Sequence, residues 1–171
     1  RLHLLITILF LGMNSAQAAE IQVPKNQAKL EINGAVCAYC AYGMQKGLSK
    51  QDWIDRSFAH KGVETDIENQ IVTLYLKEGE AVKLPETYQA ILKGGYEPRI
   101  FHLRVQGTPM KEDGKVYLAD DSGKKAFELV GSNVDQLAMN QVYDLQLRIE
   151  EEVLKQIKKN PVAQAHIHTI F

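Results

Sequence analysis

Cysteine is scarce in this sequence: Cys37 and Cys40 are the only two in 171 residues, and two residues separate them. A disulfide between them would close so short a loop that it would stabilise the fold only slightly. The C-x-x-C spacing therefore favours metal binding or thiol redox chemistry over a structural bridge.

An excess of charge of either sign is also lacking. The 20 lysines and arginines nearly balance the 21 aspartates and glutamates, which gives a formal net charge of −1. This balance gives no support to nucleic-acid binding or to an anionic membrane surface, and we expect neither. The sequence also shows no paired carboxylates, no nucleophile beside a base and no phosphate-binding loop, so we do not expect an enzyme.

Long apolar runs are missing after the first eleven residues, so we do not expect an integral membrane protein. The run Leu4–Leu11 is too short to span a bilayer, and Ala16-Gln17-Ala18 follows it as an A-x-A cleavage pattern. We interpret residues 1–19 as a secretory signal peptide and expect a periplasmic or secreted protein. The alternative is that the apolar run is an ordinary strand or a membrane anchor.

The first half of the remaining chain alternates between strand and helix patterns. Cys40, Met44 and Leu48 recur at helical spacing, and alternating polar and apolar residues precede them. The expected order is strand 29–32, a helix from Cys40, strands 63–67 and 71–76, a helix from Pro85 and strand 100–105. This βαββαβ order predicts an α+β fold, a ferredoxin-like sandwich, for residues 20–105.

The motif Gly34-x-x-Cys37-x-x-Cys40 before a helix, with Gly95-Tyr96 after the second helix, resembles the heavy-metal-associated domain family over residues 28–105. That family includes copper chaperones, modules of copper-pumping ATPases and the periplasmic mercury-binding protein. The resemblance implies that Cys37 and Cys40 bind Cu(I) or Hg(II), and that Tyr96 lies beside the metal loop.

The sequence departs from the family's pattern in two places. Ala35 and Val36 stand where the family usually has Met and Thr. Residues 49–61, which include Trp53 and Phe58, are longer than the family's usual turn. The longer segment either extends the first helix or forms an added lid, and we expect its aromatic residues to anchor it to the core.

The chemistry of the two cysteines favours a soft cation. Soft metals prefer thiolates, and a thiol at a helix N-terminus ionises more readily than usual. No further Cys or His lies in the loop, so a closed four-ligand zinc site is not expected. An open two-ligand site suits transfer of the ion, and we expect a metal carrier or sensor whose partner is a membrane transporter or efflux component.

Two other functions stay open. Cys37-Ala38-Tyr39-Cys40 resembles the active site of thioredoxin-like disulfide isomerases, and Gly107-Thr108-Pro109 resembles their cis-proline loop. Only three residues separate Pro109 from Asp113, too few for the strand that the thioredoxin fold requires there. The other alternative is an adaptor in which the metal-binding fold is only a scaffold.

The second half, residues 106–171, has the pattern of a small barrel. Strands are expected at 115–119, 125–130, 142–149 and 162–170, with a first strand near 104–107 and a short helix within 133–140. Five short strands with a helix between the third and fourth resemble an OB-like β-barrel. Residues 150–159 are expected to form either a linker or a further helix.

A second metal site is conceivable at the end of this barrel. His166 and His168 are two residues apart on an expected strand, so both side chains point to one face and can chelate a metal. The alternative is two polar residues on the wet face of an edge strand, which we favour because no third ligand is evident.

Overall fold

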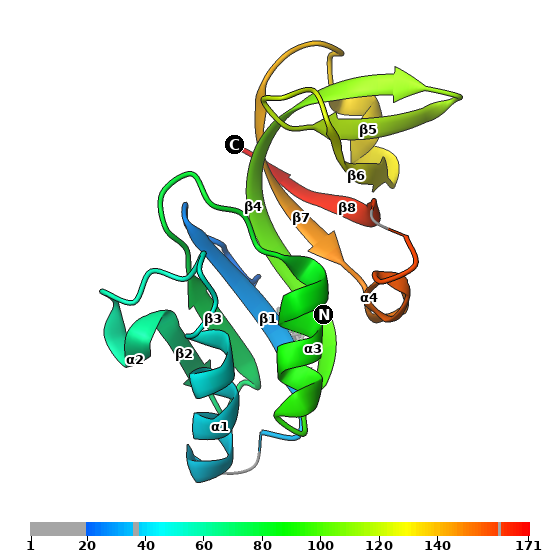
Figure 1. Cartoon of the computed structure of the whole chain (residues 1–171). Helices are drawn as coiled ribbons and strands as arrows, with labels where there is room; N and C mark the ends of the chain where they lie inside the picture. Colours follow the sequence, from blue (N-terminus) through cyan, green and yellow to red (C-terminus); the bar gives the residue numbers. More distant parts are fainter. Residues whose placement is uncertain (1–19, 36–37, 161) are drawn as a thin grey trace, which may run out of the picture.

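A single long strand, β4 (Glu97–Glu112), runs through the whole molecule and joins a helix-covered sheet to a β-barrel (Figure 1). The computed structural model describes residues 20–35, 38–160 and 162–171. The expected signal peptide, residues 1–19, lies outside the described residues. The mixed α and β composition and the barrel that follows the first sheet confirm the predicted fold class in outline.

The first sheet consists of three strands and the N-terminal part of β4. They are β1 (Gln27–Asn33), β2 (Val63–Asp66) and β3 (Ile71–Tyr75). Their order is β2-β3-β1-β4, and every neighbouring pair is antiparallel. Along β1, Ala28, Leu30 and Ile32 are buried while the residues between them are less so, which is the alternation that a sheet covered on one face requires.

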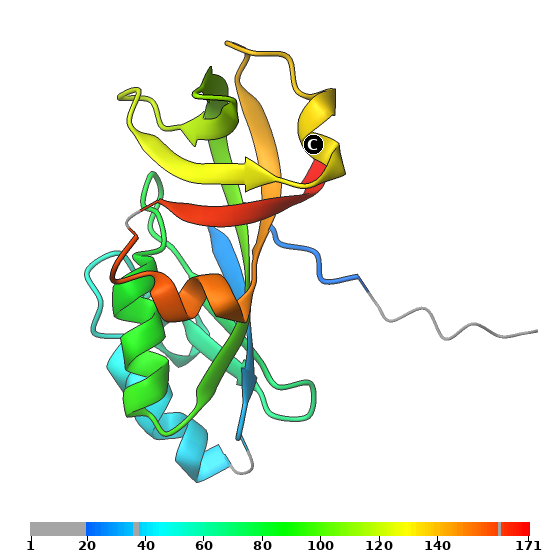
Figure 2. The same ribbon diagram turned by 90° about the vertical axis from the view of Figure 1, so that its right-hand side faces the viewer.

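Two helices cover one face of this sheet: α1 (Ala38–Leu48) and α3 (Leu84–Lys93). Figure 2 shows both on the same side of the strands, and the segment that precedes β1 on the other side. Pro85 stands in the first turn of α3, where its missing N–H costs nothing. Met44 and Leu48 of α1 and Ile91 of α3 are fully buried against the sheet. The strands and helices predicted for this half are present near their expected positions, except that the strands expected at 100–105 and near 104–107 are one continuous strand, β4.

The longer segment after α1 packs onto the sheet and ends in the short helix α2 (Ala59–Gly62). Trp53 and Ile54 are completely buried, and Ile54 forms a β-bridge with Leu76. Phe58 is 49% exposed and stacks on the ring of Tyr75, with 4.5 Å between the ring centroids. The expected anchoring is therefore confirmed for Trp53, whereas Phe58 covers the surface of the sheet.

The C-terminal part of β4 and four further strands form a closed barrel. The strands are β5 (Lys115–Ala119), β6 (Lys125–Val130), β7 (Tyr143–Ile149) and β8 (Ala163–Ile170). They close in the order β4-β5-β6-β8-β7-β4, and only the β6–β8 pair is parallel. A 3₁₀ helix, η1 (Ser132–Gln136), precedes β7, and the helix α4 (Glu151–Gln156) follows it.

The expected boundary between residues 105 and 106 falls inside β4. β1 pairs with β4 as far as Leu103, whereas β7 pairs with it from Phe101 to Gly107. One apolar cluster runs from Ala28 in the sheet to Ile167 in the barrel. Gly107 allows the close approach at the junction, because a Cβ there would lie 2.5 Å from the carbonyl oxygen of Ala119. The sheet and the barrel therefore share a strand and a core.

Within the described ranges, none of the helices is both long and apolar enough to span a bilayer.

Candidate functional site

The structure describes only part of the cysteine motif. Cys37 lies outside the described residues, together with Val36. Cys40 belongs to the first turn of α1, but its side chain is likewise outside the description. The backbone on both sides is defined: β1 ends at Asn33, and α1 begins at Ala38. The first turn of α1 contains no Asp or Glu, so no carboxylate from this turn offsets the partial positive charge at the helix N-terminus.

Gln70, in the turn between β2 and β3, holds the start of the motif in place. The backbone N–H of Ala35 donates to Oε1 of Gln70 at 2.9 Å, and Nε2 of Gln70 donates to the carbonyl oxygen of Ala35 at 2.6 Å. The carbonyl oxygen of Gln70 also accepts the N–H of Ile32. Sequence reasoning assigned Gln70 only to a turn, and its role depends on a contact 35 residues away that no local pattern reveals.

Tyr96 lies beside the first residue of the motif. A Cβ on Gly34 would be 3.8 Å from Cδ1 of Tyr96, and the tyrosine itself is only 3% exposed. Its hydroxyl oxygen finds no hydrogen-bond partner among the described residues. Burial raises the pKa of Tyr96, so its phenol stays neutral. The structure thus places Tyr96 against the start of the cysteine loop, with an unused hydroxyl.

The surface of α1 next to the motif is unusually aromatic. Tyr39 is 89% exposed and Tyr42 is 60% exposed, whereas Met44 on the opposite face is fully buried. Met44 therefore fills the core, as its helical spacing with Leu48 indicates. The two tyrosines lie one helical turn apart, so both belong to the exposed face that begins at the cysteine loop.

The segment Gly107-Thr108-Pro109, which resembles a cis-proline loop in sequence, lies within β4. Thr108 pairs with Ala119 and Pro109 pairs with Leu118, both in the ladder to β5. These residues are part of the barrel wall and do not form a loop.

The two histidines proposed from the sequence as a second site, His166 and His168, both lie on β8 but have different neighbours. His168 Nε2 is 2.9 Å from Oε1 of Glu20, and its ring meets the ring of His102 edge-on with 6.4 Å between centroids. His166 is exposed, and Gly131 lies beside its Nδ1. In the ranges that the structure describes, no group of three His, Cys, Asp or Glu side chains is placed to hold a metal ion.

His102 is a buried histidine on β4, and it carries an unusual hydrogen-bond pattern. It is 3% exposed, and its Nε2 donates to Oε1 of Glu31 on β1 at 2.6 Å. Its Nδ1 has no partner within the described part of the chain. Burial lowers the pKa of His102, and this effect outweighs the opposing influence of Glu31. In the neutral ring Nδ1 is only an unused acceptor, whereas protonation would create a buried N–H without a partner.

The stability of the protein is therefore expected to fall in mild acid. Because the pKa of His102 in the folded state is lower than its usual value of 6.5, the unfolded chain binds the proton more readily. The stabilisation that depends on neutral His102 is complete above pH 6.5. As the pH falls below 6.5, the free energy of unfolding decreases by at most about 1.4 kcal/mol per pH unit.

Urea unfolding of the wild type and of His102→Gln at several pH values measures this decrease. The His102→Gln profile should be flatter, while exposed His166→Gln should follow the wild type. A wild-type slope that survives in His102→Gln would contradict the assignment.

Comparison with protein-family models, curated protein sequences and solved structures gave no match to this chain.

Proposed function

We propose that this protein binds a soft metal ion, Cu(I) or Hg(II), through the thiolates of Cys37 and Cys40. It would act as a carrier or sensor in the periplasm or outside the cell. The observation that carries the proposal is the position of Gly34-x-x-Cys37-x-x-Cys40, which joins the end of β1 to the first turn of α1. Thiolates are the ligands that soft cations prefer, and a helix N-terminus favours the ionised form of a thiol.

The arrangement around the motif supports the same function. The strand order β2-β3-β1-β4, with α1 and α3 on one face, is the arrangement expected of a ferredoxin-like sandwich, which we infer for the first half. For the barrel we infer an OB-like fold, because its closing order β4-β5-β6-β8-β7 and the 3₁₀ helix before β7 match that pattern.

Two described residues, Gln70 and Tyr96, would assist the two cysteines. Gln70 fixes the backbone of Ala35, so the chain leaves β1 for the loop at a defined position. The ring of Tyr96 packs beside Gly34 at the start of the loop, and its phenol is neutral. The metal is cargo in this proposal, and a membrane transporter or efflux component is the partner that would receive it.

The test is metal uptake by the reduced full chain, followed by native mass spectrometry with Cu(I) or Hg(II). We expect one ion per wild-type chain and none on the Cys37→Ser, Cys40→Ser double variant. The His166→Ala, His168→Ala double variant is the matched control and should keep the wild-type stoichiometry. Equal uptake by the wild type and the cysteine variant would refute the proposal. Reduction of a model disulfide by a chain that binds no metal would favour thiol–disulfide exchange instead.

A further inference from the structure

Along one edge of β4 the neighbouring strand changes from β1 to β5, and a gap separates these two strands. β1 pairs with this edge up to Leu103, and β5 pairs from Thr108 onward. β7 occupies the opposite edge, where it pairs with Phe101–Gly107. Asn140, just before β7, donates its N–H to the carbonyl oxygen of Pro109, so that carbonyl faces the β7 side. Residues 104–107 therefore have no ladder partner on the β1/β5 edge within the described part of the chain.

The direction of the backbone groups in this gap follows from the strand's geometry. Successive residues of a strand turn their N–H and C=O groups to opposite edges, and the carbonyl of Pro109 faces β7. Gly107, two residues earlier, has the same orientation as Pro109. Gln106 then directs its N–H and C=O groups toward the gap, and Gln106 is exposed. This edge is therefore ready to pair with another extended segment.

A cleft of about 580 Å³ opens over the gap. Its walls are the start of β1, the loop between β3 and α3, and the turn between β5 and β6. Partly or fully buried Val82, Leu118 and Phe127 give it an apolar lining. Such a volume accommodates a short stretch of peptide, and the apolar side chains provide pockets for those of its residues that point inward.

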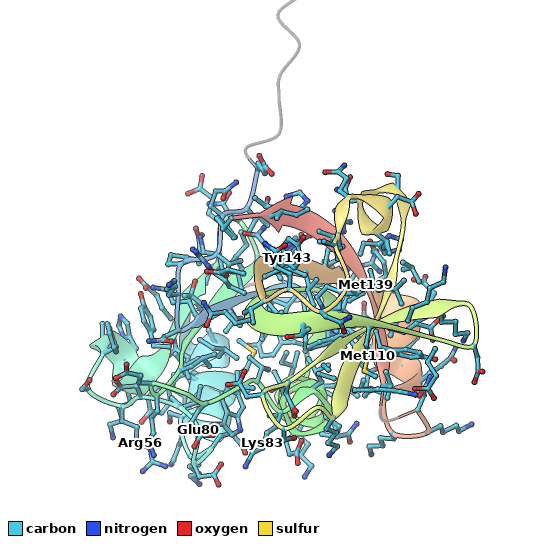
Figure 3. All side chains as sticks on the ribbon, turned by 90° about the horizontal axis from the view of Figure 1, so that it is seen from above. Arg56, Glu80, Lys83, Met110, Met139 and Tyr143 are labelled. Carbon is cyan, nitrogen blue, oxygen red and sulfur yellow. The ribbon has the colours of Figure 1, made fainter. Side chains whose placement is uncertain are left out.

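The rim of the cleft is acidic. Glu78 and Glu80 lie in the β3–α3 loop, and Asp121 lies in the β5–β6 turn. Glu80 is labelled in Figure 3. All three are exposed. The guanidinium of Arg104 does not offset them, because Asp144 engages it with two hydrogen bonds of 2.9 Å. Lys25, the other cation in the lining, lies 3.9 Å from the same Asp144 carboxylate. Acidic side chains therefore outnumber basic ones around the cleft, and this excess favours a basic ligand.

We propose that this cleft binds an extended segment of a partner protein with alternating apolar and basic residues, which adds a short strand to β4 at residues 104–107. In an extended chain, alternate side chains point to opposite faces. One set would enter the apolar lining and the other would reach the carboxylates of the rim, while the backbone pairs with Gln106. The proposal does not involve Cys37 or Cys40, so it stands or falls independently of metal binding.

A fluorescein-labelled peptide of alternating valine and lysine, titrated with the full chain and followed by anisotropy, tests the charge requirement. We expect Glu78→Lys combined with Glu80→Lys to weaken binding by about tenfold or more. Glu68→Lys combined with Glu97→Lys changes the net charge by the same amount at two exposed positions outside the cleft, and this control should bind within about twofold of the wild type. Equal binding of a valine–glutamate peptide, or an equal loss in this control, would overturn the proposal.

The pairing with the backbone has its own test. Gln106→Pro removes the N–H that faces the gap, while Gln106→Ala keeps it, so only the proline variant should lose binding. Amide hydrogen exchange of the wild type, with and without the valine–lysine peptide, avoids any effect of the proline on folding. New protection at Gln106 supports the proposal, and protection confined to other strands would refute it.

Discussion

Replacing Trp53 by alanine is expected to lower the free energy of unfolding by about 3–5 kcal/mol. Trp53 is fully buried although it belongs to a connecting segment, and it fastens residues 49–62 to the sheet. Its indole N–H has no hydrogen-bond partner among the described residues, so the cost comes from lost apolar contacts and from the cavity that remains. Urea denaturation followed by circular dichroism measures the change.

Phe58→Ala is the matched control, since it removes an aromatic ring from the same segment. Phe58 is 49% exposed and makes its main contact by stacking on Tyr75, so we expect a loss of about 0.5–1.5 kcal/mol. If the two variants were destabilised equally, the segment would not be anchored through Trp53.

The second large loss of stability is expected when Phe101 is replaced by alanine. Phe101 is fully buried on β4, where the sheet and the barrel meet. Phe101 pairs with Leu30 on one edge and with Ile149 on the other, so its side chain lies in the core that both halves share. Phe101→Ala should cost about 3–5 kcal/mol and should destabilise both halves together. Because the strand is common to both, unfolding should remain a single transition.

Two probes separate this outcome from independent domains. The fluorescence of Trp53, the only tryptophan, reports on the first half, and the amide signals of β6 and β8 report on the barrel. The two urea midpoints should shift together in Phe101→Ala. Ile100→Ala, one residue earlier and only half-buried on the opposite face, should cost about 1 kcal/mol. Separate midpoints would mean that the halves fold independently.

Much of the local structure was predictable because its signals lie within short stretches of sequence. Polar and apolar residues alternate along β1 and β7, and Met44 and Leu48 are spaced to face the core from one helix. Pro85 marks the start of α3, as expected. The barrel strands were also expected at nearly their observed positions, since turn residues such as Asp120–Gly123 separate them.

The contacts that position the candidate site were not predictable in the same way. Gln70 reaches Ala35, and Glu31 reaches His102, across 35 and 71 residues of sequence. Gln146 is fully buried, and it donates to the carbonyl oxygen of Ile21 and accepts the N–H of Val23. Sequence patterns predict that a polar residue is exposed, and only its hydrogen-bond partners in the folded chain explain why it is buried.

The sequence by itself determined the order of strands and helices, the spacing of Cys37 and Cys40 and the apolar faces of the elements, because periodicity and turn residues act over a few positions. Only the tertiary structure decided that β4 continues through both halves, and that its edge is left open between β1 and β5. The reason is physical: where a strand finds its partners depends on loop closure and on burial of a common core, and both join residues far apart in the sequence.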